Sequence, residues 1–357
     1  MGFKAAPAAA GVTSLGELGD ATTLQGAVKL KEGANVTITR DDANNALAIA
    51  GAAAPVYNAP NLGPLIDFQL ANLPSDAFGK LPVVTTAPYC YYLPLLGDRA
   101  LFSPINNLTG TVRLLQLLDY SQYALAGEPA TCGGSMPTEV VSGRYIYMPQ
   151  GFSASGVRGS GFYRYDPWTD AWATMTAITS LGATYRFNYT NGCIWDGGDN
   201  VYVLGGYDGV TDRATFKYSI SGDSWTELTD FPLGGSCAFA GSCHLVGGDI
   251  YAYEATGETF YKYNLAGDTW TALTAPGVNQ AYPGLVQSSV DTDKLYLIGG
   301  AGAGYVGRYS ISGDSWTTLT GTNIPGEMQG KGIFIATPIP CILQYRRSTT
   351  QMWVYKI

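Results

Sequence analysis

The sequence predicts an all-β protein, and three observations lead to that prediction. Its 357 residues include 46 glycines and 25 tyrosines but only 13% charged residues, a composition that suits turns and pleated strands better than amphipathic helices. The octapeptide YSISGDSW occurs twice, at Tyr218–Trp225 and Tyr309–Trp316. Short Tyr-rich runs, each introduced by a Gly/Asp turn, recur upstream of these copies and are typical of strands.

The first 56 residues differ from the rest of the chain. They begin with a polar, Gly/Ala-rich stretch, and two alternating segments follow, NVTIT at 35–39 and ALAIA at 46–50, separated by the turn-rich RDDANN. This pattern predicts a β-hairpin. A lone hairpin is not stable in water, so we expect residues 1–56 to trimerise or to dock on a larger body. Residues 57–80 are punctuated by proline and are expected to form a connector.

The octapeptide belongs to a longer series. YDPWTDAW at 165–172 and YNLAGDTW at 263–270 keep the Tyr and the Trp in the same places, and a degenerate copy, YRRSTTQMW, runs from 345 to 353. The tryptophans at 172, 225, 270 and 316 are 53, 45 and 46 residues apart, a period typical of four-stranded units arranged around an axis. We interpret these aromatic residues as a structural blade repeat: Tyr165, Trp172, Tyr218, Trp225, Tyr263, Trp270, Tyr309, Trp316 and Trp353.

Six units are predicted when an early relative, GDRALFSP at 97–104, is counted with the others. We place them near residues 81–128, 130–176, 182–229, 234–275, 280–320 and 326–357. Each unit is expected to have four strands, the third ending near the repeat Tyr and the fourth starting at the repeat Trp. Six such sheets around an axis would form a β-propeller over residues 81–357, and a closed ring would protect the strand edges.

Two of these units resemble kelch repeats. YVLGGYDG before FKYSISGDSWTEL, and YLIGGAGAG before GRYSISGDSWTTL, carry a double glycine after the second strand, with Tyr and Trp bracketing the third hairpin. Only Gly205-Gly206 and Gly299-Gly300 keep the double glycine in its family place, whereas Gly247-Gly248 lies in the preceding turn. The resemblance implies a kelch-like β-propeller from about residue 81 to the C-terminus.

The N-terminal segment resembles a second family. The phrase LQGAVKLKEGANVTIT, followed by NALAIAG, is similar to the N-terminal attachment and shaft modules of bacteriophage tail fibres and head fibres. This resemblance implies a virion protein on the phage particle surface that contacts other virion proteins through residues 1–56 and assembles as a homotrimer. Such a protein would be made in the host cytoplasm without a signal peptide.

Composition excludes several kinds of partner and site. A net charge of −8 with only 20 Lys and Arg argues against nucleic acid, which proteins bind mainly by neutralising phosphates. No stretch is long enough to span a membrane. The six cysteines show no C-x-x-C spacing and are expected to be buried thiols, with a Cys237–Cys243 disulfide as the alternative. A single histidine, His244, cannot supply the two-histidine copper site of the galactose-oxidase type of kelch enzyme, so we expect no metal and no cofactor.

The octapeptide itself is interpreted as structural. Its centre, SISGD, has the residue types of a tight turn, and we expect Gly222 and Gly313 to adopt positive φ angles. The Tyr and Trp rings should wedge between neighbouring blades with their polar tips near a partner. The recurring aspartates fit turn positions better than they fit the carboxylate pair of a glycosidase.

Function is therefore expected in the loops that do not repeat. Loops between second and third strands, and those joining one unit to the next, should share one face and form a receptor-binding rim, because binding residues concentrate on loops. The expected rim residues are Phe152, Arg158, Tyr185, Arg186, Tyr189, Tyr207, Asp208, Arg213, Tyr282 and Tyr305. We expect a fibre or spike protein that binds a host-surface glycan or protein without catalysis. The alternatives are a propeller glycosidase or polysaccharide depolymerase, and a purely structural capsid or tail decoration protein.

Overall fold

The structure, a computed structural model, describes residues 36–41 and 46–51 and most of the chain from residue 73 onward. The longer gaps after residue 73 are 85–94, 103–110, 117–121, 128–140, 152–158, 188–191, 206–212, 234–238, 301–303, 320–324, 336–338 and 347–350. For strands β1, β2 and β4–β6, only the backbone is described. The chain divides into two compact units, Met1–Val56 and Tyr57–Ile357.

The first unit contains the predicted hairpin. Strand β1 (Val36–Asp41) pairs antiparallel with β2 (Ala46–Gly51). Val36 lies opposite Gly51, and Asp41 lies opposite Ala46. Apolar and polar residues alternate in β1, and large apolar residues alternate with alanine in β2, as expected when successive side chains point to opposite faces. The prediction of a hairpin here is confirmed.

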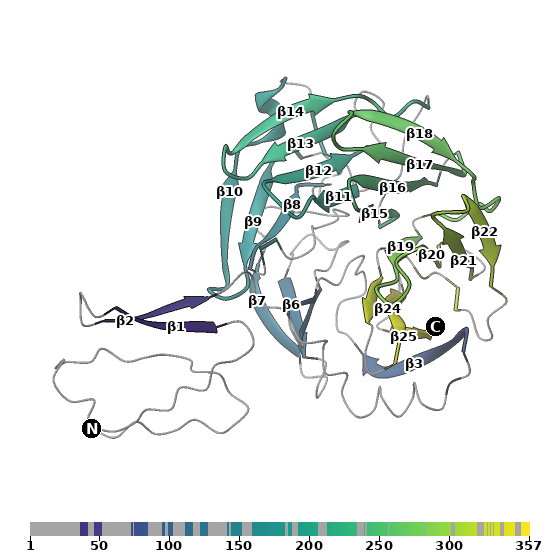
Figure 1. The fold of residues 1–357 in the computed structure, drawn as a ribbon, viewed down its shortest axis with the longest axis horizontal. Coiled ribbons are helices and arrows are strands. Elements are labelled where there is room, and N and C mark those ends of the chain that lie inside the picture. The colour runs from purple at the N-terminus through teal and green to yellow at the C-terminus, as the bar shows by residue number, and fades with distance from the viewer. Residues whose placement is uncertain are drawn as a thin grey trace. The chain divides into compact units, whose positions relative to one another are not determined.

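The second unit is an all-β propeller, and Figure 1 shows its sheets arranged around a common centre. Three four-stranded antiparallel sheets follow one another along the chain, in which sequence order is also spatial order. Their strands are β11 (Gly192–Trp195), β12 (Asn200–Leu204), β13 (Thr215–Ser219) and β14 (Ser224–Leu228); β15 (Cys243–Val246), β16 (Asp249–Glu254), β17 (Thr259–Asn264) and β18 (Thr269–Leu273); and β19 (Gly284–Gln287), β20 (Lys294–Ile298), β21 (Val306–Ser310) and β22 (Ser315–Thr318). The first strands β11, β15 and β19 lie side by side near the centre.

Three further sheets belong to this unit. One has four strands, β4 (Leu95–Leu96), β5 (Arg99–Phe102), β6 (Thr111–Gln116) and β7 (Gln122–Gly127). Another has three described strands, β8 (Ile146–Pro149), β9 (Phe162–Asp166) and β10 (Ala171–Met175). The last combines β23 (Ile333–Ile335), β24 (Cys341–Arg346) and β25 (Gln351–Lys356) with β3 (Ala77–Val84) from the other end of the unit.

The predicted number of four-stranded blades is corrected by this arrangement. Among the described residues five sheets have four strands, so this part of the chain forms five such blades and not six. The sheet β10-β9-β8 has three strands among the described residues, because its β8 corresponds to the second strand of the other sheets. Residues 130–140, where the prediction required a further strand of that unit, lie outside the described residues.

The ring is closed by the pairing of β3 with β25. Tyr355 lies opposite Phe78 and Lys356 opposite Ala77, with an irregularity in the register between Gln351 and Trp353. The unit predicted at 326–357 therefore supplies three strands, and its outermost strand begins inside the segment predicted to be a connector. A closed ring leaves fewer unpaired strand edges, which are prone to aggregation.

The hydrophobic core consists of clusters between neighbouring sheets. One cluster joins Tyr147 and Phe162 of β8 and β9 to Val201 and Tyr218 of the next sheet. Equivalent clusters pair β12 with β16, β16 with β20, and β20 with β25 and β3. In second strands such as β12 and β20, every residue after the first is buried. This is expected for strands that are covered on both faces.

Antiparallel pairing in chain order gives each four-stranded sheet two distinct ends. The turns between first and second strands and between third and fourth strands lie at one end, which we name the hairpin face. The loops between second and third strands and the connections from one sheet to the next lie at the other end, which we name the loop face. Of the predicted rim residues, the four that the structure describes, Tyr185, Arg186, Arg213 and Tyr305, belong to loop-face segments, and the octapeptide turns belong to the hairpin face.

Candidate functional site

The repeat Tyr and Trp residues form a hydrogen-bonded clamp between neighbouring sheets. In β13 and β14, the Tyr218 hydroxyl donates to Asp223 Oδ1 (2.5 Å), which also accepts from the Thr176 backbone N–H (2.8 Å). Trp225 Nε1 donates to the Thr176 carbonyl oxygen (2.7 Å). Thr176, which follows the outer strand β10 of the preceding sheet, is thus held at both its N–H and its carbonyl group. We name this arrangement the inter-sheet clamp.

The same clamp recurs at three other sheet boundaries. In each, a Tyr hydroxyl bonds to the Asp five residues later, and the Asp and the Trp bond to one residue of the preceding sheet. The sets are Tyr165, Asp170 and Trp172 on Ala126; Tyr263, Asp268 and Trp270 on Thr229; and Tyr309, Asp314 and Trp316 on Thr274. The predicted wedge role of the repeat Tyr and Trp residues is confirmed at these boundaries.

The clamp aspartates also shape the turn. Asp223 and Asp314 adopt φ angles of 44° and 41°, and Asp170 and Asp268 adopt 50° and 49°. Asp tolerates the left-handed region better than most residues because its short side chain bonds locally. The prediction placed the positive φ at Gly222 and Gly313, one residue too early, and neither glycine has a positive φ. Gly222 instead occupies a tight place where an added Cβ would lie 3.0 Å from Ser219 Oγ.

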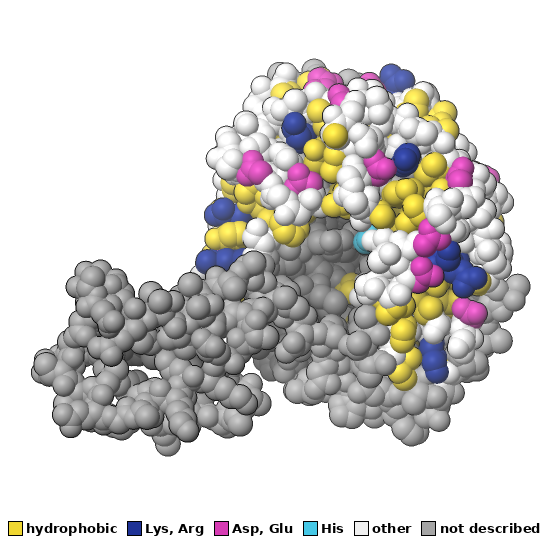
Figure 2. All heavy atoms as spheres, viewed as in Figure 1, with side chains coloured by type: hydrophobic (Ala, Val, Ile, Leu, Met, Phe, Trp, Pro, Cys, Tyr) yellow, Lys and Arg dark blue, Asp and Glu magenta, His cyan; other side chains and the backbone are white. Residues whose placement is uncertain are grey.

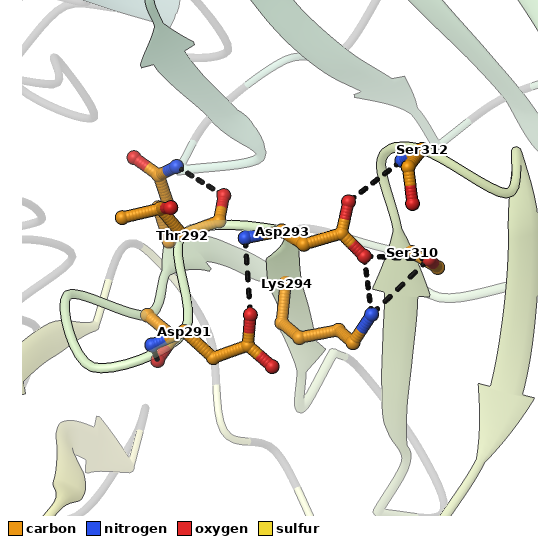
Figure 3. Close-up of polar contacts among 8 residues, drawn as sticks. Asp291, Thr292, Asp293, Lys294, Ser310 and Ser312 are labelled. Carbon is orange, nitrogen blue, oxygen red and sulfur yellow. Dashed lines mark hydrogen bonds and ion pairs between the residues drawn. The ribbon is translucent and has the colours of Figure 1, made fainter.

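A second aspartate explains the serines of the octapeptide. Asp199, in the turn before β12, accepts from the hydroxyls of Ser219 and Ser221 and from the Ser221 N–H, each at 2.8 Å. In the other copy, Asp293 accepts from Ser310 Oγ (2.7 Å), from the Ser312 N–H (2.7 Å) and from Lys294 Nζ, as Figure 3 shows. Each octapeptide is therefore tied to the neighbouring hairpin of its own sheet.

The repeat in the last sheet is split between distant parts of the chain. The Tyr355 hydroxyl donates to Asp76 Oδ1 (2.8 Å), and Asp76 has a φ of 57°. Phe78 packs on Tyr355 with ring centroids 4.9 Å apart, close to the 5.0 Å between Tyr218 and Trp225. Residues 75–78, SDAF, thus take the place of GDSW in the octapeptide. The predicted copy at 345–353 is wrong, because Tyr345 and Trp353 lie in the second and third strands of this sheet.

Ionisation strengthens the clamp at neutral pH. Burial raises the pKa of Tyr218, and the hydrogen bond to Asp223 raises it further. Burial alone would raise the pKa of Asp223, but hydrogen bonds from Tyr218 and Thr176 hold that pKa below its ordinary value. For Asp314, the hydrogen bond from Tyr309 is the main cause of a lowered pKa. The tyrosine therefore stays protonated and the aspartate ionised over a wide pH range.

Three predicted rim residues lie close together on the loop face. Tyr185 donates its hydroxyl to Glu227 Oε2 (2.7 Å) and packs edge-on against Phe216. Arg186 Nη1 donates to the Tyr185 carbonyl (2.7 Å). The Arg213 side chain is 46% exposed and lies 3.9 Å from the Asp230 carboxylate. The hydrogen bond to Glu227 and burial raise the pKa of Tyr185, and the charge of Asp230 raises it further by a smaller amount. We name Tyr185, Arg186, Arg213, Glu227 and Asp230 the rim cluster.

The other rim predictions have different outcomes. Tyr305 is only 7% exposed and belongs to the core cluster between two sheets, so its ring is not available to a receptor. The Tyr305 ring lies against Gly307, where there is no room for a Cβ. The absence of a side chain at Gly307 leaves the space in which the ring is buried. The remaining six lie outside the described residues: Phe152, Arg158, Tyr189, Tyr207, Asp208 and Tyr282.

The described residues also locate the groups considered for catalysis. His244 lies on the innermost strand β15, as predicted, and Figure 2 shows this only histidine near the middle of the ring. Cys193, Cys243 and Cys341 are buried. Within the part of the chain that the structure describes, no group of three or more His, Cys, Asp or Glu residues is placed to hold a metal ion. No helix in that part is long and apolar enough to cross a membrane.

One exposed feature was missed at the level of sequence. Trp168, in the turn between β9 and β10, is 60% exposed, and its backbone N–H donates to Asp166 Oδ1 (3.0 Å). Asp166 also forms an ion pair with Arg144 (2.5 Å). The signal was available, because Trp168 stands where the other copies have the small residues Ser221, Ala266 and Ser312.

Comparison with known proteins gives no family for this chain. A scan against models of protein families finds no match, and a search among curated proteins finds none. The functional proposal therefore depends on the residues and geometry of this chain and on the two resemblances visible in its sequence.

Proposed function

We propose that this protein is a bacteriophage fibre or spike protein whose propeller binds a receptor on the host surface. The N-terminal unit supports the virion role, because its hairpin lies in the segment that resembles tail-fibre and head-fibre attachment modules. That unit is compact and separate from the propeller. In this proposal residues 1–56 contact other virion proteins and bring three copies together, and the propeller carries the recognition surface.

The rim cluster is the single observation that carries the binding role. Tyr185, Arg213 and Asp230 come from segments that do not repeat, whereas the third hairpin turns of the hairpin face carry the repeated Asp of the clamps. A half-buried ring beside exposed Arg and carboxylate groups offers both contact area and hydrogen bonds, and a ring loses little conformational entropy on binding. Three copies on one particle would raise the effective affinity, because later contacts become intramolecular.

We further propose that the propeller is of the kelch type. The double glycines support this assignment, since Gly205, Gly299 and Gly300 adopt positive φ angles of 63°, 82° and 111° after the second strands. These backbone conformations explain why glycine is needed there. The Tyr and Trp of each inter-sheet clamp occupy the positions of the kelch third hairpin.

Antibodies against residues 57–357 test the virion role. We expect them to label purified phage particles and to block adsorption to the host. Unlabelled particles would contradict the proposal, and labelled particles whose adsorption is unchanged would favour a decoration role. Incubation of the protein with host capsule should leave the polymer intact, and released oligosaccharides would favour the depolymerase alternative.

The rim cluster is tested by matched charge removals. Arg213→Ala should reduce adsorption of the virion or binding of the protein to host cells. Lys262→Ala is the control, because Lys262 forms a comparable ion pair with Asp249 (3.3 Å) near the hairpin face. Equal effects of the two variants would remove the rim cluster from the binding role. Solution mass measurements on the full chain and on residues 57–357 test the oligomer, for which we expect a trimer and a monomer.

A further inference from the structure

The hairpin face carries an exposed surface that the clamps do not explain. Trp168 is 60% exposed, whereas the residues at this place in the other three copies are Ser221, Ala266 and Ser312. A large ring is not required to form the turn, because the small residues form the same turn in the other sheets. Among the described residues, Val290 is the only other exposed large hydrophobic side chain.

The Trp168 turn is held in place by charged neighbours. Asp166 accepts from the Trp168 N–H at one oxygen and from Arg144 Nε (2.9 Å) and Nη2 (2.5 Å) at the other. Burial alone would raise the pKa of Asp166, but bonds from Arg144, Trp168 and Thr169 hold that pKa below its ordinary value. The carboxylate therefore stays ionised at neutral pH and fixes both the turn and the guanidinium.

A second aromatic ring adjoins the same ion pair. The guanidinium carbons of Arg144 and Arg164 lie 5.0 and 4.4 Å from the centroid of the Tyr145 ring. Guanidinium groups stack on rings in this way and keep N–H donors available at their edges. Arg144 has five N–H donors, and its side chain remains 47% exposed. We name Arg144, Tyr145, Asp166 and Trp168 the Trp168 surface.

The composition of this surface favours a small polar ligand over a protein. A protein–protein interface of ordinary size buries about 1,200–2,000 Å² and has an apolar centre. The two exposed hydrophobic side chains in the described residues lie on different sheets, so they do not form such a centre. A pyranose ring has a flat C–H face that fits an indole and hydroxyls that fit a guanidinium edge. A few fixed polar groups beside an aromatic surface are typical of small-molecule sites.

We infer that the Trp168 surface is a saccharide-binding site, in which a pyranose stacks on the Trp168 ring and accepts hydrogen bonds from Arg144. Asp166 is the positioning residue that holds both groups. The site lies on the hairpin face, whereas the proposed receptor-binding rim lies on the loop face. It therefore goes beyond the proposed function, and it is measured on the purified chain whatever the virion role.

Tryptophan fluorescence gives a direct test. All seven tryptophans lie in described residues, and Trp168 is the only exposed one, so acrylamide should quench mainly its emission. The probes are oligosaccharides of neutral pyranoses and of uronic acids, presented on an array and in solution. We expect at least one class to bind and to protect Trp168 from quenching; which class binds distinguishes a neutral from an acidic polymer. Binding of neither class would overturn the proposal.

Variants assign the binding to this surface. Trp168→Ala should weaken binding roughly tenfold or more, since aromatic anchors dominate small interfaces, and Arg144→Lys should weaken it less. Val290→Ala is the matched control and should leave binding unchanged; all three substitutions are at exposed side chains, so the fold should persist. Binding that survives Trp168→Ala would overturn the inference. Loss through Tyr185→Ala instead would place the sugar on the rim cluster and leave the proposed function standing.

Discussion

The pairing of a repeat Tyr with an Asp and a second aromatic ring is supplied by the chain in two ways, which we name the contiguous clamp and the split clamp. In the third hairpin of β11–β14, Tyr218, Asp223 and Trp225 lie within eight residues. In the last sheet, Tyr355 comes from the C-terminus, whereas Asp76 and Phe78 lie 279 and 277 residues earlier. The geometry of the Tyr and its partner ring is nearly the same. The contiguous clamp bonds two neighbouring sheets together, whereas the split clamp bonds the two ends of the propeller chain within one sheet.

This difference predicts that the split clamp matters more for cooperativity than the contiguous one. Forming it closes a loop of nearly the whole propeller, which costs more entropy than closing a hairpin. The position of β3 at the outer edge of the last sheet means that its loss would expose β25 and the buried Tyr355 ring.

Removing β3 should have the largest effect. A chain that begins at residue 85 should lose cooperative thermal unfolding, because β25 becomes an unpaired edge and the Phe78–Tyr355 contact disappears. A chain that begins at residue 57 is the control and should unfold at nearly the temperature of the full chain. Circular dichroism melts compare the two. Similar melts for both truncations would show that β3 does not close the ring.

Removing the clamp carboxylates should have the next largest effect. Asp223→Ala leaves the buried Tyr218 hydroxyl without its acceptor, which costs about 1–3 kcal/mol in the free energy of unfolding, and places alanine at a positive φ. Asp76→Ala should cost a similar amount. Asn at either position keeps an oxygen acceptor and tolerates this φ, so it should cost less. Urea titrations measure all four variants, and equal losses for Ala and Asn would contradict the clamp.

Converting the contiguous clamp into the form of the split one should have a smaller effect. Trp225→Phe removes the bond from Trp225 Nε1 to the Thr176 carbonyl and retains the ring, so the expected cost is about 0.5–1.5 kcal/mol. Trp195→Phe is a control, because its Nε1 bonds only within its own turn, to Gly198. A cost for Trp195→Phe equal to that for Trp225→Phe would remove the argument for an inter-sheet role.

The pH dependence should separate the two halves of each clamp. The pKa of Asp223 is lowered on folding, so its contribution to stability is present above the ordinary Asp value near 4 and is lost as pH falls. The pKa of Tyr218 is raised, so its contribution is lost as pH rises above about 10. Melting temperature against pH should fall at both ends, and Tyr218→Phe should flatten part of the alkaline limb. An unchanged alkaline limb in that variant would contradict the assignment.

Sequence reasoning predicted that the repeat Tyr and Trp residues lie between blades because two identical octapeptides and two similar ones recur, with their tryptophans 53, 45 and 46 residues apart. It missed the split clamp because SDAF is too short to detect. Trp353, eight residues after Tyr345, was mistaken for the repeat Trp. Tyr305 was misplaced because the sequence does not show that its ring fills the space beside Gly307. Trp168 could have been found, since it interrupts a turn that is otherwise built from small residues.

Amide hydrogen exchange of residues 77–84 in the full chain tests the closure of the ring most directly. In this segment residues 77–80 and 84 pair with β25, so their amides should exchange as slowly as those of β14, the outer strand of the β11–β14 sheet. Asp76→Ala should accelerate exchange in this segment before it affects β14. Exchange of residues 77–84 at the rate of an unpaired peptide would contradict a propeller closed by β3.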